Sequence, residues 1–194
     1  MTVVDGPPRL VRDARDLAQT LLAGLPQRWR HTVGVARRAE VISPAVDSAH
    51  DAELLIAAAW LHDIGYASPL HATGFHPLDG ARYLLAHRWP MSVAALVAHH
   101  SDADDIAFIR GLARDLADFP DPPAAIADAL TYADQTVGPD GTSMTFTRRV
   151  RDMLARHGPD SPNAAAHPRR EPVLRAAVTR VERRLATFGS TSYA

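Results

Sequence analysis

Residues 57–66 read AAAWLHDIGY, an apolar run that ends in a histidine and an aspartate side by side. Residues 51–63 are rich in Ala and Leu, and they predict a central helix that is apolar on nearly every side. Gly65 is the expected C-cap of this helix. Neighbouring helical residues point about 100° apart. His62 and Asp63 are therefore expected to face one cation together only in a relaxed last turn, where the negative helix end also favours positive charge.

Helical spacing of apolar residues extends along most of the chain. The expected helices cover residues 11–25, 28–42, 51–63, 76–88, 89–100, 104–118, 123–136, 145–157 and 172–188, with a Pro- and Asn-rich loop at 158–168. No stretch alternates in the manner of a β-strand. We therefore expect an all-α fold, a single-domain helical bundle over residues 1–194. Its motif-bearing core is 28–140, and C-terminal helices follow at 145–188.

Composition excludes several kinds of chemistry. The chain has 194 residues, a net charge of −1, no cysteine and no lysine, since all 21 basic residues are arginine. Disulfides, thiolate metal sites, a Cys nucleophile, a phosphate-loop Lys and a Schiff-base Lys are thereby ruled out. The balanced charge gives no reason to expect a nucleic-acid partner. The apolar runs are too short for a membrane span, and the first ten residues lack the apolar core of a signal peptide, so we expect a cytoplasmic location.

Four side chains in sequence order provide nitrogen and oxygen ligands. His31 lies upstream of His62 and Asp63, and Asp134 lies downstream. Such a set suits a divalent transition metal such as Fe, Mn, Co, Ni or Zn. Further histidines begin one expected helix and end the next, which is more than one ion needs. We therefore expect one or two ions per chain, with Asp63 bridging them. The candidate ligands are His31, His62, Asp63, His76, His99, His100 and Asp134, with His99 and His100 as alternatives for one position.

Each of these residues also has an ordinary structural explanation. His31 alone would be a boundary histidine beside two arginines, and Asp134 alone a solvated helix residue. His62 and Asp63 alone would be a pair that caps a helix. The order and helix positions of all four together favour the metal site. The remaining histidines are expected at the surface: His50, His71, His87, His157 and His167.

The same residues resemble the HD-domain metal-dependent phosphohydrolases. The resemblance is carried by RWRHTVGVARRA, AAAWLHDIGY, HPLDGARYLL, VAHHSD and LTYADQT, over roughly residues 28–140. It implies a helical bundle around a metal centre. It also implies that the ligands of a first metal are His31, His62, Asp63 and Asp134. The HxxxGA motif at 76–81 and the histidine at 99 or 100 resemble the extra pair of members with two metals.

The resemblance implies hydrolysis of a phosphate ester or anhydride by metal-activated water, with a nucleotide as the expected small-molecule substrate. Monoesterase, diesterase and pyrophosphohydrolase activities stay open, as does a homodimer. The expected catalytic residues are Asp63, His62 and His76, and the expected substrate-binding residues are Arg82, Tyr66 and Arg28. Arg148 and Arg149 are further candidates for holding phosphate.

Two subfamilies are similar to this chain in different motifs. The symmetrical dinucleoside tetraphosphate hydrolases resemble it in RxxHTxGVA and HxxxGA, and the cyclic-dinucleotide phosphodiesterases in HDIG and the double histidine. The chain departs from the former in TYADQTVGPDG and from the latter at Tyr66 and after His100. Two alternatives use the same residues: a di-iron HD-type oxygenase and a non-catalytic ligand-binding HD module.

Overall fold

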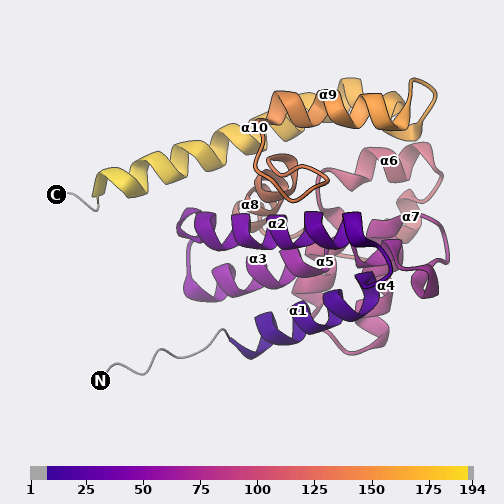
Figure 1. The fold of residues 1–194 in the computed structure, drawn as a ribbon, viewed down its shortest axis with the longest axis horizontal. Coiled ribbons are helices and arrows are strands. Elements are labelled where there is room, and N and C mark those ends of the chain that lie inside the picture. Colours follow the sequence, from indigo (N-terminus) through magenta and orange to yellow (C-terminus); the bar gives the residue numbers. More distant parts are fainter. Residues whose placement is uncertain (1–7, 192–194) are drawn as a thin grey trace.

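The structure describes residues 8–191, and Figure 1 shows this computed structural model as an assembly of helices. The described residues form ten α-helices, three short 3-10 helices and no strand. The α-helices are α1 (Arg9–Leu22), α2 (Pro26–Ile42), α3 (Ala49–Leu61), α4 (His76–Ala86), α5 (Met91–His99), α6 (Ala103–Ile109), α7 (Ala113–Leu116), α8 (Ala124–Gln135), α9 (Phe146–His157) and α10 (Pro162–Thr191). The 3-10 helices are η1 (Ser43–Ala45), η2 (Ile64–Tyr66) and η3 (Ser68–Leu70). The all-α prediction is confirmed, and the ends of the predicted domain, 1–7 and 192–194, lie outside the described residues.

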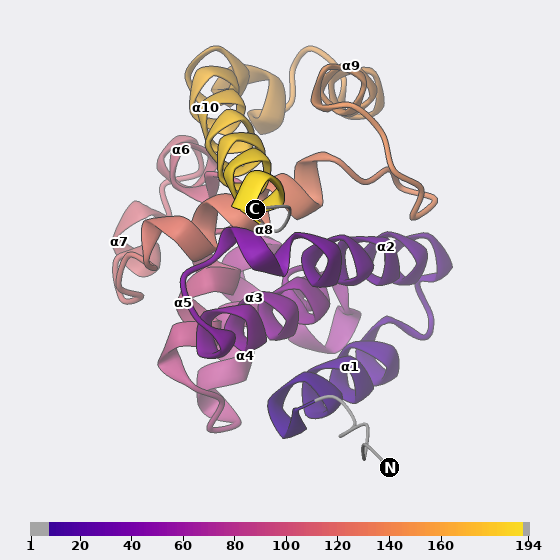
Figure 2. The same ribbon diagram turned by 90° about the vertical axis from the view of Figure 1, so that its left-hand side faces the viewer.

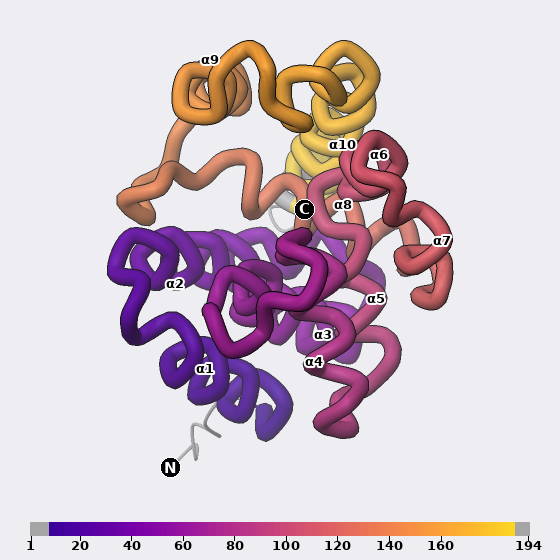
Figure 3. Tube along the Cα trace, turned by 90° about the vertical axis from the view of Figure 1, so that its right-hand side faces the viewer, coloured from indigo at the N-terminus to yellow at the C-terminus, as the bar shows by residue number. Residues whose placement is uncertain are grey.

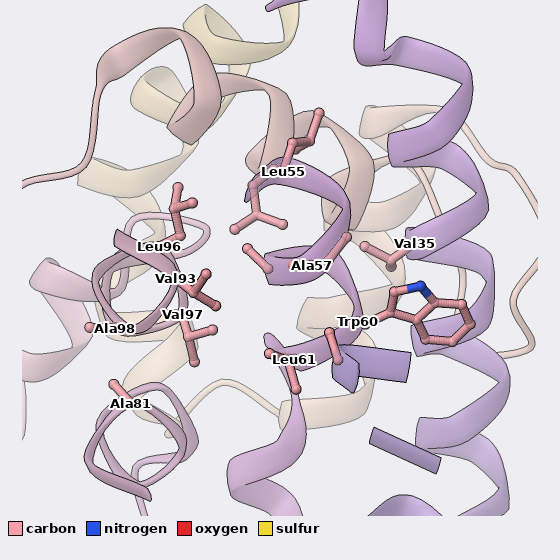
Figure 4. Packing of buried hydrophobic residues seen from close by; sticks show 14 of the residues in the cluster. Val35, Leu55, Ala57, Trp60, Leu61, Ala81, Val93, Leu96, Val97 and Ala98 are labelled. Carbon is pink, nitrogen blue, oxygen red and sulfur yellow. The ribbon is translucent and has the colours of Figure 1, made fainter. Parts of the chain in front are cut away.

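Helix α3 is the centre of the main hydrophobic core. It packs against α1, α2, α5 and α8, as its apolar character on all sides predicts. Figure 4 shows α3 between α2, which contributes Val35, and α5, which contributes Leu96. Leu55 and Leu61 of α3 are fully buried, and each such side chain stabilises the fold by about 1.5–3 kcal/mol. The buried helix α3 therefore ends directly before His62, and its packing fixes the position of the residues that follow.

Helices α9 and α10 cover one side of this bundle. Figures 2 and 3 show α9 and the first part of α10 lying beyond α8, apart from the α1–α5 layers. α9 packs mainly against α10 and α8. Beneath it lies a small cluster of its own, in which Phe146, Leu174 and Val178 are buried. We call α9 and α10 the cover. None of the helices in the described part of the chain combines the length and the apolar character needed to cross a bilayer.

Two predicted boundaries were wrong. The single helix expected at 104–118 is broken into α6 and α7, because Gly111 adopts a left-handed φ of 72° between them. The loop expected at 158–168 is largely helical, since α10 begins at Pro162 and runs through both later prolines. Ser161 accepts a hydrogen bond from the backbone N–H of Ala164. A serine cap followed by proline at the first helical position is a helix start, and this signal was present in the sequence.

Gly65 does not cap α3 as predicted. The helix ends at Leu61, and Gly65 lies inside η2 without a left-handed φ. Its importance is one of space, because a Cβ at this position would lie 2.0 Å from the carbonyl oxygen of His76 and 2.8 Å from the backbone nitrogen of Gly80. The absent side chain lets η2 lie directly against the first turn of α4. This contact brings the residues after α3 next to His76.

Candidate metal centre

Ends and faces of five helices meet at one buried cluster of histidines and aspartates. The cluster consists of His31 from α2, His62 and Asp63 after α3, His76 from α4, His100 after α5 and Asp134 from α8. It contains two groups whose ligand atoms all lie within 4.8 Å of one another: His31, His62 and Asp63 in one, and Asp63, His76 and His100 in the other. Asp63 belongs to both groups.

The Asp63 carboxylate faces a histidine on each side. Its Oδ1 lies 3.4 Å from Nε2 of His76, and its Oδ2 lies 3.5 Å from Nε2 of His62. Oδ2 also accepts a hydrogen bond of 3.0 Å from Arg28, whose guanidinium stacks on the ring of Tyr66 at 3.8 Å. The relaxed turn predicted after α3 does direct His62 and Asp63 toward the same place, and Asp63 spans the two groups.

The backbone sets which ring nitrogen of three histidines carries the proton. Nδ1 of His62 lies 2.8 Å from the carbonyl oxygen of Ala59, and Nδ1 of His100 lies 2.7 Å from that of Val97. Nδ1 of His31 lies 3.0 Å from the carbonyl oxygen of a glycine in the turn after α8. Because a carbonyl only accepts, each Nδ1 donates, and each Nε2 presents a lone pair to the cluster. This is the arrangement by which proteins orient metal-binding histidines.

Two observations test whether a cation fits these residues. Nε2 of His62 is buried and has no hydrogen-bond partner, although buried polar atoms are nearly always satisfied. Nε2 of His31 faces Oδ1 of Asp134 at 3.0 Å, so a lone pair meets a carboxylate oxygen unless a proton or a cation lies between them. A divalent transition metal would satisfy both atoms with ligands that it prefers. The residues present therefore fit such an ion.

The pKa values of the cluster agree with this fit. Burial lowers the pKa of His62 to about 4 and holds that of His76 well below its ordinary value, so both rings are neutral at pH 7. Burial alone would raise the pKa of Asp63, but the neighbouring His62 and Arg28 outweigh it and hold that pKa far below its ordinary value. Neutral imidazoles and ionised carboxylates are the forms that bind metal.

Asp134 is held by its neighbour Gln135 and by residues from outside its own helix. Ser101 donates a hydrogen bond of 2.5 Å to its Oδ2, and Arg149 of the cover donates one of 3.3 Å to its Oδ1. Ser101 and Asp102 both have left-handed backbones, with φ of 54° and 53°, which is unfavourable for residues other than glycine. Arg170 of α10 donates to the carbonyl oxygens of both. The cover therefore stabilises the turn that directs Ser101 at Asp134.

A cavity of about 90 Å³ opens between the cluster and the cover. Asp63, His76, His100 and Asp134 line one wall, with Tyr66 and Arg28 beside them. The other wall comes from the cover and includes Arg149, Arg156, His157, His167 and Arg170. Sequence reasoning assigned His157 and His167 to the surface and did not single out Arg156 or Arg170. These four residues form no recognisable sequence motif. They reach the cavity only because α9 and α10 fold over α8.

The structure does not bring three of the predicted residues to the site: His99, Arg82 and Arg148, the last of which is exposed on α9 and does not line the cavity. Nδ1 of His99 lies 3.1 Å from Asp104, and its Nε2 lies 3.0 Å from the carbonyl oxygen of Phe119. His99 is therefore engaged outside the cluster. Of the two alternatives, His100 is the histidine that lies in the cluster with Asp63 and His76. Arg82 forms an ion pair with Asp115 of α7 and does not line the cavity. Tyr66 and Arg28, by contrast, lie beside Asp63.

Comparison with known proteins identifies the family. A search of curated proteins and a search of solved structures found no match. Residues 28–136 match the model of the HD domain family, and this range contains the whole cluster but neither helix of the cover. The match extends over more than half of the 194 residues. The chain therefore belongs to the HD domain family.

Proposed function

We propose that this protein is a metal-dependent phosphohydrolase that acts on a phosphate ester or anhydride through metal-activated water. The observation that carries the proposal is the position of Asp63. One carboxylate faces a histidine pair on each side, which is the arrangement needed to hold two cations close together. Most members of the HD domain family are metal-dependent hydrolases. The cluster also opens on a cavity lined by arginines, which suits an anionic substrate.

The contacts of the side chains support the following roles. His31, His62, Asp63 and Asp134 would hold one ion, and Asp63, His76 and His100 a second. Bound divalent ions lower the pKa of a coordinated water toward about 7 and polarise phosphoryl oxygens.

Arg28 stacks on Tyr66 beside Asp63, and it is placed to bind a phosphoryl oxygen and offset the charge that develops on it. Arg149 contacts Asp134 and would assist Arg28 in offsetting this charge.

Metal analysis followed by an activity screen tests the proposal. We expect the purified protein to bind up to two divalent ions and, when loaded, to hydrolyse at least one of p-nitrophenyl phosphate, bis(p-nitrophenyl) phosphate and inorganic pyrophosphate. Removing the ions with a chelator should abolish turnover. Asp63→Ala should lose metal and activity together. Asp118→Ala is the matched control, because Asp118 is exposed and lies outside the cavity, and it should retain both.

Other outcomes would redirect the assignment. An Asp63→Ala protein with near-normal turnover would contradict attack by metal-activated water at this cluster. Consumption of dioxygen by the iron-loaded protein, without hydrolysis of any phosphate ester, would favour the oxygenase alternative. Metal binding with neither activity would favour the ligand-binding module. A nucleotide as the substrate, a homodimer and a cytoplasmic location stay predictions from the sequence.

A further inference from the structure

One face of α9 is directed at the cavity. The residues of α9 that line it are Arg149, Val150, Met153, Arg156 and His157, a spacing that falls on a single side of a helix. Arg149 is buried and contacts Asp134, whereas Arg156 lies two turns farther along, about 10 Å along the axis. Asp152 accepts a hydrogen bond from Nε of Arg156, and a guanidinium has four further N–H donors. The face therefore offers free N–H donors beyond the metal ligands, with a positive charge that Asp152 offsets in part.

Other arginines gather around the end of this face. Arg28, Arg149 and Arg156 also line a second, smaller cavity beside His31. The pKa of His157 lies below its ordinary value, first because of partial burial and then because of nearby positive charge. The charges that lower it belong to four arginines: Arg156, Arg28, Arg149 and Arg170. These side chains come from α2, α9 and α10, and the fold brings their charges together at one end of the cavity.

The carboxylates that line the cavity are the same ones that would bind the metal. Asp63 and Asp134 are the only carboxylates that line it among the described residues, and both are candidate ligands. Once a divalent ion shares these carboxylates, Arg28 and Arg149 lose most of the opposing charge beside them. A partly buried cation without a partner is unfavourable. Metal loading would therefore leave a cavity that favours an anion of more than one charge.

We propose that Arg156 and His157 bind the second phosphoryl group of a substrate that contains a phosphoanhydride, while Arg28 and Arg149 bind the first at the metal centre. This inference rests on the proposed function and names its substrate class. Hydrolysis adds one water across the P–O–P linkage: a new P–O bond forms, the bond from the attacked phosphorus to the bridging oxygen breaks, and the two products share the protons of the water. The volume of about 90 Å³ is below the roughly 300–1,000 Å³ of sites that enclose larger ligands, so it suits phosphate groups rather than a whole nucleoside.

Binding of a non-hydrolysable diphosphonate tests the subsite. Methylenediphosphonate and orthophosphate are titrated into metal-loaded protein by calorimetry, and bound metal is measured before and after each titration. We expect the diphosphonate to bind about 10- to 100-fold more tightly, the range for a hydrogen bond to a charged group. Arg156→Gln should remove most of this preference without changing the metal content. Arg151→Gln is the matched control, since Arg151 is exposed on the same helix and does not line the cavity.

The two proposals fail in different ways. If Arg156→Gln and Arg151→Gln both keep the wild-type preference for the diphosphonate, with metal content unchanged, the subsite is overturned and the hydrolase proposal stands. If the wild-type protein binds both anions equally, the subsite is overturned as well. If the preference is present and lost in Arg156→Gln, but the metal-loaded protein hydrolyses no phosphate ester or anhydride, the subsite is supported and the proposed activity is refuted.

Discussion

Gly65→Ala adds only one methyl group, but it should strongly disturb the ligand group formed by Asp63, His76 and His100. The added Cβ would lie 2.0 Å from the carbonyl oxygen of His76, whereas ordinary contacts begin at 3.4 Å. The oxygen belongs to the backbone and a Cβ is fixed rigidly to its own Cα, so relief requires η2 and the first turn of α4 to separate by about 1.4 Å, the difference between these two distances. Metal sites tolerate about 0.2 Å in ligand distances. The displacement would pull His76 away from Asp63, and the ligand group that contains both residues would be lost.

Stability should fall as well. Overpacking a well-packed contact lowers the free energy of unfolding by about 1–3 kcal/mol. Replacing glycine by alanine also reduces the freedom of the unfolded chain, which stabilises the fold by only about 0.4–1 kcal/mol. The measurements are metal stoichiometry after saturation and urea unfolding of the metal-free protein. We expect one ion instead of two and a net loss of about 1–2 kcal/mol in the free energy of unfolding.

Two further glycines make a graded control series. An added Cβ at Gly80, on the other side of the same contact, would lie 3.3 Å from its nearest atoms, and one at Gly24 would meet nothing within 4 Å. Gly80→Ala should therefore have a small effect and Gly24→Ala none on metal binding. A Gly65→Ala protein with the wild-type metal content and stability would refute the reasoning.

Two other predictions concern the turn after His100. Arg170→Met should lower the free energy of unfolding by about 2–3 kcal/mol, since it leaves the carbonyl oxygens of Ser101 and Asp102 without their donor; an unchanged urea midpoint would count against it. Burial raises the pKa of Asp102 to about 6 despite the nearby Arg170. The folded state therefore holds this proton more tightly than the unfolded chain, and stability from this group should be lost as pH rises from about 4 to 6. Asp102→Asn cannot ionise, so in chelator its stability relative to the wild type should rise across that range, and a constant difference would contradict the assignment.

Local patterns were sufficient for most of the helices and for the region of the cluster. Apolar residues at helical spacing predicted α1, α2, α3 and α8 closely, because their buried faces are continuous along the sequence. Apart from His31, which lies inside α2, the ligands are either adjacent in the sequence or near helix ends, so a single chain already indicates them. Ser161 and Pro162 also carry the pattern of a helix start, at the beginning of α10. The later prolines of this helix made the segment resemble a loop.

The remaining features depend on tertiary contacts. Sequence spacing does not decide between His99 and His100, because the choice depends on where α5 ends and on a left-handed turn formed without glycine. The same holds for Arg82, which has the spacing of a pocket residue but meets Asp115, a residue 33 positions away. The arginines of the cover act on the cluster only because α9 and α10 fold back over α8.

The small hydrophobic cluster beneath α9 has an evolutionary consequence. Only Phe146, Leu174 and Val178 are buried there, separately from the main core that supports the metal ligands. Substitutions on the cavity side of α9 can therefore accumulate without disturbing the packing around α3. At Arg156 and His157, selection can alter the charge and shape that an incoming molecule meets while Arg149 keeps its contact with Asp134. Exchange of the whole of α9 and α10 would be more costly, because Arg149 and Arg170 hold Asp134 and the turn after His100.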